Sequence, residues 1–211
     1  MYLERVKRLI VDGICDPNAM YSGLWATSIQ DTDKIITRFF DDCYKAGPNE
    51  CPLYAEKGPA SIQAILESTL ESLNKTPLAV SGALGHGPEV ITFSDVMRLV
   101  KEAVYSPIDL FPVLADLVAD VSSGNGSKFA SYKAKAPTKI CATRSLDAHA
   151  VEDCPPYSEM LYDVLTAISC TDGQDLSNFW NKSQIFNEYY GLLRTQSKWM
   201  ADYWMSWTLS R

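Results

Sequence analysis

The sequence has 211 residues, of which 46% are apolar and 21% charged, the composition of a globular protein that buries a hydrophobic core. Its 26 acidic and 19 basic residues give a formal charge of −7, which opposes the attraction to phosphate groups that nucleic-acid binding requires. No apolar run approaches the roughly 20 residues that span a bilayer. We therefore expect neither a nucleic-acid partner nor a membrane partner.

The first predicted element is a short strand over residues 6–11. Val6 and the run Leu9-Ile10-Val11 are apolar, charged residues lie beside them, and Gly13 follows, a pattern typical of one buried strand. A lone strand needs neighbours in a sheet. This strand therefore implies a sheet to which the rest of the chain contributes little.

A series of amphipathic helices is predicted to follow. Apolar residues recur at the spacing that gives a helix one buried face, and Thr92 with Asp95 provides an N-terminal capping pair. The predicted helices run from Asp31 to a Gly47-Pro48 stop, over Ser61–Leu73, over Val96–Tyr105 and over Leu110–Val121.

The last third of the chain is predicted to be mixed. Residues 122–139, rich in Ser, Gly, Lys and Ala, indicate an exposed loop, and an irregular segment continues to residue 156. A helix is expected over Tyr157–Ile168, a second short strand over Ala167–Cys170, and tryptophan-rich helices after it. The predicted fold class is predominantly α with one or two short strands.

Cysteines and glycosylation motifs favour a secreted protein. Six cysteines, at positions 15, 43, 51, 141, 154 and 170, are too scattered for a zinc site with paired C-x-x-C motifs, and disulfides formed in an oxidising compartment explain them better. Asn74, Asn125 and Asn181 each begin an N-x-[ST] sequon, the acceptor motif for N-glycosylation. Residues 1–8 are charged and do not have the apolar core of a signal peptide.

Several separate stretches of the sequence resemble one family, the tripeptidyl-aminopeptidase-like serine hydrolases, relatives of proline iminopeptidase with the α/β-hydrolase fold. The stretches are Leu9-Ile10-Val11-Asp12-Gly13 through Asp16-Pro17, Tyr21-Ser22-Gly23-Leu24-Trp25, Asp31-Thr32-Asp33-Lys34, Phe39-Phe40-Asp41-Asp42-Cys43 to Ala46-Gly47-Pro48 and Cys51, Val104-Tyr105-Ser106-Pro107, and Ala167-Ile168-Ser169-Cys170-Thr171-Asp172-Gly173. Residues 122–156 match least.

The resemblance implies a partial hydrolase. Residues 1–17 would be a strand and turn of the core, residues 18–166 a helical cap with its irregular segment at 122–156, and residues 167–211 the return to the core. The nucleophile is expected upstream of Met1, and the catalytic Asp and His beyond Arg211. The absence of a G-x-S-x-G pentad agrees with this expectation. The implied partners are a peptide with a free N-terminus and the remainder of the hydrolase core, with no cofactor.

The resemblance also implies site residues. It pairs Cys43 with Cys51, where the alternative is two buried free thiols. Cys141 and Cys154 could close the irregular segment in the same way, and Cys170 could pair with a cysteine outside this chain, whereas the partner of Cys15 stays open.

A substrate-binding role is predicted for three residues. The resemblance suggests that Asp172 lines the subsite for the α-ammonium group of the substrate, a group that a partly desolvated carboxylate suits. The alternative is an acid that caps the following loop or helix. Trp25 and Trp180 could form apolar walls of a peptide cleft, or belong to the core, as Trp199, Trp204 and Trp207 could.

Other kinds of site and function are weighed beside this one. His149 lies among acidic residues and Cys154, but their spacing fits no metal template, so no metal is predicted. The chain could be a stand-alone helical module that binds a peptide or lipid without catalysis. It could also be the cap of an esterase or lipase-like hydrolase, since a cap does not fix the bond that is cleaved.

Overall fold

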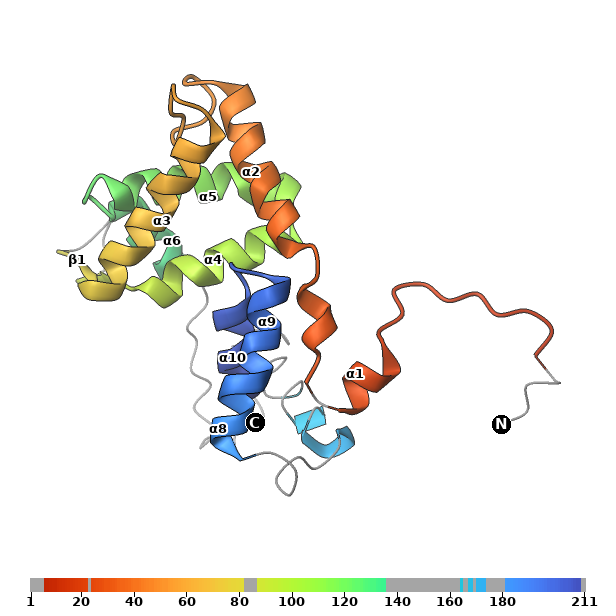
Figure 1. The fold of residues 1–211 in the computed structure, drawn as a ribbon. Helices are drawn as coiled ribbons and strands as arrows, with labels where there is room; N and C mark the ends of the chain where they lie inside the picture. The colour runs from red at the N-terminus through yellow and green to blue at the C-terminus, as the bar shows by residue number, and fades with distance from the viewer. Residues whose placement is uncertain are drawn as a thin grey trace, which may run out of the picture. The chain divides into compact units, whose positions relative to one another are not determined.

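The structure of the protein is a computed structural model, and it describes residues 6–22, 24–81, 87–135, 164, 167–168, 170–173 and 181–209. It is predominantly helical with short strands, as predicted from the sequence (Figure 1). The chain divides into two compact units. We call Asp31–Glu159 the helical unit, and Met1–Gln30 together with Met160–Arg211 the terminal unit.

Helices make up most of the helical unit. Its elements are α2 (Thr32–Ala46), α3 (Pro59–Lys75), β1 (Leu78–Val80), β2 (Glu89–Ile91), α4 (Phe93–Tyr105), α5 (Pro107–Ser122) and α6 (Ser127–Lys135). Helices α2 to α5 pack on one another, and α6 packs against α5 and β2. Figure 1 shows α2 and α3 converging at the loop that joins them. The strands pair antiparallel, with Leu78 opposite Ile91.

The core of the helical unit is formed by the apolar faces that the sequence predicts. The ring of Phe39 on α2 lies 5.2 Å from that of Phe111 on α5, centroid to centroid. Each of the helices α2 to α6 contributes side chains that are at most 2% exposed: Ile36, Phe39, Phe40, Ile62, Leu66, Val96, Leu99, Val100, Leu114, Val118 and Phe129. The four helices predicted for this region are confirmed.

Two helix ends match the predicted signals. Thr92 and Asp95 form a capping box before α4: the Asp95 backbone N–H donates to Thr92 Oγ1 (3.2 Å) and the Thr92 N–H to Asp95 Oδ2 (2.8 Å). Helix α2 ends at Gly47, whose φ of 80° suits a residue without a side chain. Local chemistry therefore sets where these helices begin and end.

Helix α6 corrects the prediction of an exposed loop over residues 122–139. The side chain of Asp120, at the end of α5, is buried, and its Oδ2 accepts hydrogen bonds from the backbone N–H groups of Lys128 (2.8 Å) and Phe129 (3.1 Å). These N–H groups belong to the first turn of α6 and have no partner within their own helix. The cap comes from the preceding helix, so the sequence of the segment itself does not reveal it.

We expect Asp120→Ala to lower the free energy of unfolding of the helical unit by about 2 kcal/mol, because it removes this cap from the partly buried N–H group of Lys128 and the buried N–H group of Phe129. Asp120→Asn keeps a carbonyl oxygen at the same place and should cost less than half as much. Urea denaturation followed by circular dichroism compares the two variants. Equal losses for both would contradict this role of the Asp120 carboxylate.

The terminal unit is assembled from both ends of the chain. Its elements are α1 (Pro17–Tyr21), a 3₁₀ helix η2 (Ala26–Ile29), α8 (Lys182–Gln184), a π-helix η4 (Ile185–Tyr189), α9 (Tyr190–Gln196) and α10 (Ala201–Leu209). The indole N–H of Trp204 donates to the carbonyl of Trp25 (3.1 Å), and the Tyr189 hydroxyl donates to the carbonyl of Leu24. These bonds join segments of the chain that are more than 160 residues apart.

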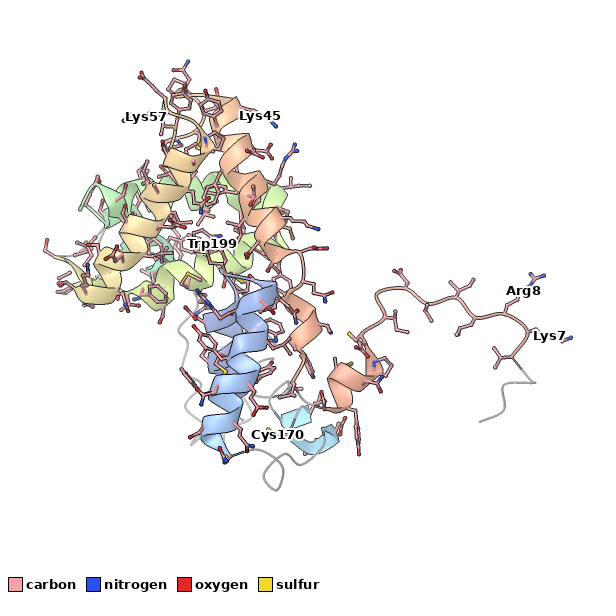
Figure 2. The ribbon with its side chains drawn as sticks, in the orientation of Figure 1. Lys7, Arg8, Lys45, Lys57, Cys170 and Trp199 are labelled. Carbon is pink, nitrogen blue, oxygen red and sulfur yellow. A yellow bond between two sulfur atoms is a disulfide. The ribbon has the colours of Figure 1, made fainter. Side chains whose placement is uncertain are left out.

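Neither predicted strand is found at its predicted position. Residues 6–11 are extended but pair with no strand in the part of the chain that the structure describes, and Leu9 and Ile10 are 77% and 94% exposed. Figure 2 shows Lys7 and Arg8 on this extended stretch. Ala167, Ile168 and Cys170 are helical. A strand forms only where a neighbour completes its hydrogen bonds, and the hairpin β1–β2, which the sequence did not predict, supplies such a neighbour within itself.

Candidate functional site

Asp172 lies in a short helical stretch of the terminal unit, and its side chain is exposed. The Thr171 hydroxyl donates to its Oδ1 (3.3 Å). A carboxylate in contact with water differs from the partly desolvated one that recognition of an ammonium group favours. The role of Asp172 in substrate binding stays a prediction.

Trp25 lies just before η2 with a left-handed φ of 51° and is partly exposed. Its indole N–H donates to the carbonyl of Met20 (3.4 Å), and its own carbonyl accepts from Trp204. Trp199 and Trp204 are each 8% exposed, so the alternative assignment of the tryptophans to the core is right for these two. Trp180 and the side chain of Trp207 lie outside the described residues, so the predicted pair of Trp25 and Trp180 stays a prediction.

The structure joins Cys43 to Cys51 in a disulfide, with their Cα atoms 5.3 Å apart, in agreement with the pairing that the resemblance implies. Both residues are buried, and the bond links the end of α2 to the loop before α3. Cys15 and Cys170 are exposed free thiols in the terminal unit (Cys170 is labelled in Figure 2). Cys141 and Cys154, like His149, lie outside the described residues.

All three sequon asparagines are exposed. Asn74 lies in the last turn of α3, Asn125 between α5 and α6, and Asn181 directly before α8. An exposed carboxamide is accessible to glycan attachment. Glycosylation at these positions stays a prediction.

A cavity of about 470 Å³ lies in the helical unit between β2, α4 and α6. Volumes of this size are typical of sites for small ligands. The cavity combines charged side chains of both signs with apolar ones, and it is lined by Glu89, Asp95, Arg98, Leu99, Glu102, Phe129, Tyr132, Lys133, Ala134 and Lys135. This cavity is the strongest candidate functional site among the described residues.

The ammonium group of Lys133 joins three acceptors in this cavity. Its Nζ donates to Glu89 Oε1 (3.0 Å), to the carbonyl oxygen of Val90 (2.7 Å) and to Asp95 Oδ2 (3.1 Å). Three acceptors match the three N–H donors of an ammonium group. Because Asp95 also caps α4, this cluster connects β2, α4 and α6.

The cluster favours the charged form of both Glu89 and Lys133. A hydrogen bond from the Val90 backbone N–H, followed by the bond from Lys133, holds the pKa of Glu89 below its usual value. Burial acts to lower the pKa of Lys133, but its hydrogen bonds to Glu89 and Asp95 outweigh burial and raise it. The two carboxylates and one ammonium group leave a local charge of −1 at neutral pH.

An ion pair between Arg98 and Glu102 lines the cavity farther along α4. The Arg98 Nε donates to Glu102 Oε1 (3.1 Å), and the side chains of Arg98 and Glu102 are 62% and 29% exposed. Burial raises the pKa of the Tyr132 hydroxyl, the negative charge of Glu102 raises it further, and Arg98 acts in the opposite direction. Tyr132 is therefore neutral at pH 7 and able to donate or accept a hydrogen bond.

We expect Glu89→Gln to lower the melting temperature by about 2 °C at pH 7, since the cluster is partly exposed and such pairs contribute modestly. The folded pKa of Glu89 lies below its unfolded one, so its stabilising effect is present above about pH 4.3 and is lost as the pH falls through the folded pKa. The raised pKa of Lys133 removes its part only at alkaline pH. Thermal melts of both proteins from pH 3 to 9 test this, and a difference that does not shrink as the pH falls from 5 to 3 would contradict it.

The sequence did not reveal this cluster. Asp95 was recognised only as a capping residue, and Lys133 fell in a segment predicted to be a loop. Glu89 and Lys133 are 44 residues apart in sequence, so only tertiary folding brings them together. The available signal was the spacing of Phe129 and Lys133, which are four residues apart and would lie on one face of a helix.

Within the described residues, no group of His, Cys, Asp or Glu side chains is arranged to hold a metal ion, and no helix there is both long and apolar enough to cross a membrane. Comparisons with models of protein families, with curated proteins and with solved structures find no match to this chain.

Proposed function

We propose that this chain is the substrate-gating cap, with adjoining core segments, of a secreted serine aminopeptidase that releases short peptides such as tripeptides from free N-termini. The Ser-Asp-His triad would be supplied by the remainder of the hydrolase core, the partner of this chain. By itself the chain is expected to be inactive. The proposal rests on the sequence resemblance together with features of the two units.

The main structural support for the proposal is the division of the chain into the helical unit and the terminal unit. Residues 31–159 form a helical unit with its own buried core, while residues 1–30 and 160–211 cluster with each other. A helical unit inserted between two segments that belong together is the arrangement expected for a cap inserted in a hydrolase core.

The exposed N-terminal stretch supports the proposed partner. Leu9, Ile10 and Val11 are 77%, 94% and 53% exposed, although all three are apolar. In an extended chain, successive side chains point to opposite faces, so both faces of this stretch are apolar. Strands that are apolar on both faces are typical of sheets covered by helices on both sides, as in an α/β-hydrolase.

The Cys43–Cys51 disulfide and the three exposed sequons support secretion. Disulfides persist in oxidising compartments, and N-glycans are added to proteins of the secretory pathway. Mass spectrometry of the protein from its native source tests this, with glycans expected at Asn74, Asn125 or Asn181. Their complete absence, together with reduced Cys43 and Cys51, would contradict secretion.

Sequencing the source transcript beyond both ends of the reading frame tests the proposal. We expect in-frame sequence that adds a G-x-S-x-G pentad upstream and an Asp and a His downstream. Stop codons that bound Met1 and Arg211 in the mature message would contradict a peptidase.

A stand-alone helical binding module is the second candidate function. The observation that favours it is that the helical unit closes a core of its own and holds the cavity between β2, α4 and α6. Such a module would bind a small ligand without catalysis. A single cooperative thermal transition of the whole chain in isolation would favour this candidate, whereas aggregation through the exposed stretch at residues 6–11 would favour the hydrolase.

A further inference from the structure

We propose that the first sugar of an N-linked glycan on Asn125 occupies a pocket between α3, β1 and α5. The pocket lies in the helical unit and has a volume of about 370 Å³. We call it the hydroxyl pocket, because it is lined by the hydroxyl-bearing residues Ser68, Thr69, Ser72, Thr76 and Ser122. The proposal rests on secretion, one part of the proposed function, since N-glycans are added in the secretory pathway.

The lining of the hydroxyl pocket suits an uncharged ligand that carries hydroxyl groups. The described residues that line it are all uncharged, and the apolar side chains of Leu73, Leu78 and Val121 lie beside the hydroxyls. An ion would lose its hydration there without gaining a charged partner. A sugar ring, in contrast, combines apolar C–H faces with polar edges, and the volume lies in the range of small-ligand sites.

The hydroxyl groups present hydrogen-bond acceptors to the pocket. Those of Ser68 and Thr69 donate to the carbonyl oxygen of Ile65, at 3.0 and 2.7 Å. That of Ser122 donates to the carbonyl oxygen of Ala119 at 2.9 Å. A hydroxyl that has given its one hydrogen to a carbonyl still accepts through its oxygen. The hydroxyl and acetamido N–H groups of N-acetylglucosamine, the sugar bonded to asparagine in N-glycans, are the matching donors.

Asn125 lies at the edge of the hydroxyl pocket. Its neighbour Gly124 lines the pocket, and its other neighbour, Gly126, approaches Leu78 so closely that an added Cβ would lie 2.8 Å from the Leu78 side chain. Asn125 is exposed, and its backbone N–H donates to the carbonyl oxygen of Asp120 (3.3 Å). A sugar bonded to the Asn125 side chain therefore starts beside the pocket from an anchored backbone.

Covalent attachment explains how a pocket with such modest chemistry can be filled. A short tether gives the attached group an effective concentration in the millimolar range, so a sugar that binds weakly when free can occupy the pocket when bonded to Asn125. The sequon at Asn74 differs. Asn74 follows Ser72 by two residues on α3, about 200° around the helix, so its side chain points away from the pocket and provides a control glycan.

Thermal melts of the protein isolated from its native source, after two parallel enzymatic treatments, test the proposal. An endoglycosidase that cuts between the first two sugars leaves one sugar on each asparagine, and we expect the melting temperature to stay unchanged. Complete removal with a peptide N-glycosidase should lower it by about 3 °C. The comparison separates the sugar in the pocket from the general effect of a large glycan.

Variants secreted by a eukaryotic host assign the effect to one sequon. Asn125→Gln and Ser127→Ala each delete the sequon at Asn125 and should lower the melting temperature by about 3 °C. Asn74→Gln is the matched control, since it deletes an exposed sequon of the same helical unit, and it should change the melting temperature by less than about 1 °C.

Two further variants assign the effect to the pocket. Ser72→Phe places a ring in the hydroxyl pocket and should abolish the difference between the trimmed and the fully deglycosylated protein. Glu71→Phe places the same ring at the adjacent exposed position of α3, outside the pocket, and should retain the difference. Because the difference is taken within each variant, the effect of the substitution itself on stability cancels.

The outcomes separate this proposal from secretion. Mass spectrometry that finds glycans at Asn74 or Asn181 but an unmodified Asn125 would overturn the pocket assignment and leave secretion standing, whereas no glycan at any sequon would overturn the pocket assignment and remove the glycan support for secretion. A glycan at Asn125 whose complete removal leaves the melting temperature unchanged would overturn the pocket assignment alone. A loss that already appears on trimming to one sugar would show that the first sugar is not the occupant.

Discussion

Gly126→Ala is expected to destabilise the helical unit by about 3 kcal/mol, the sum of left-handed backbone strain and overpacking. Gly126 has a φ of 70°, and a Cβ added there would lie 2.8 Å from side-chain carbons of Ile91 and Leu78 and 2.9 Å from one of Val80. The turn between α5 and α6 therefore packs its backbone directly on the hairpin β1–β2. A larger residue fits only if the side-chain ends of Ile91, Leu78 and Val80 move.

Gly124→Ala is the matched control for this prediction. Gly124 also has a positive φ, 79°, but a Cβ at this position would meet no atom within 4 Å. Only the backbone strain should remain, about 1 kcal/mol. Urea denaturation of both variants gives the two free energies of unfolding, and equal losses would show that the close approach of Gly126 to the hairpin is not what selects glycine.

Replacing Cys43 and Cys51 together by alanine is expected to lower the free energy of unfolding by about 2.5 kcal/mol, the loop entropy that a cross-link over this short separation removes from the unfolded chain. The two residues are 8 positions apart and both are buried. Urea denaturation of the double variant measures the loss. Cys15→Ser, at an exposed free thiol, should leave the stability unchanged.

Reduction with dithiothreitol provides an independent measure of the same bond. The wild-type protein should lose at least about as much stability as the double substitution removes, again about 2.5 kcal/mol, and the double variant should lose the response that comes from this bond. A further loss in the double variant would instead reveal a second disulfide, for which Cys141 and Cys154 are the predicted pair. If the double substitution leaves the free energy of unfolding unchanged, the disulfide does not stabilise the protein.

The helices that the sequence predicted are those whose signals lie within their own segments. Thr92 and Asp95 mark the start of α4, Gly47 marks the end of α2, and the apolar spacing within each helix matches the face that is buried. These cues act over a few residues, so they can be read without knowledge of the tertiary fold.

The features that were missed depend on residues distant in sequence. Helix α6 takes its N-terminal cap from Asp120 on another helix, and the cavity cluster joins Lys133 to Glu89 on the hairpin. The stretch at residues 6–11 has the composition of a strand but lacks a paired neighbour in the described structure, so it forms no strand there. Local patterns do not specify such tertiary partners.

The central claim is that this chain gates an active site that cleaves peptides from free N-termini. The most direct measurement is the turnover of trialanyl-para-nitroanilide and of its N-acetylated form by the protein isolated from its native source. We predict release of para-nitroaniline from the free peptide, with at least about a hundredfold lower kcat/KM for the acetylated one, since acetylation removes the positive charge that the predicted carboxylate partner would bind. Equal turnover of both substrates, or cleavage of acyl esters alone, would contradict the claim.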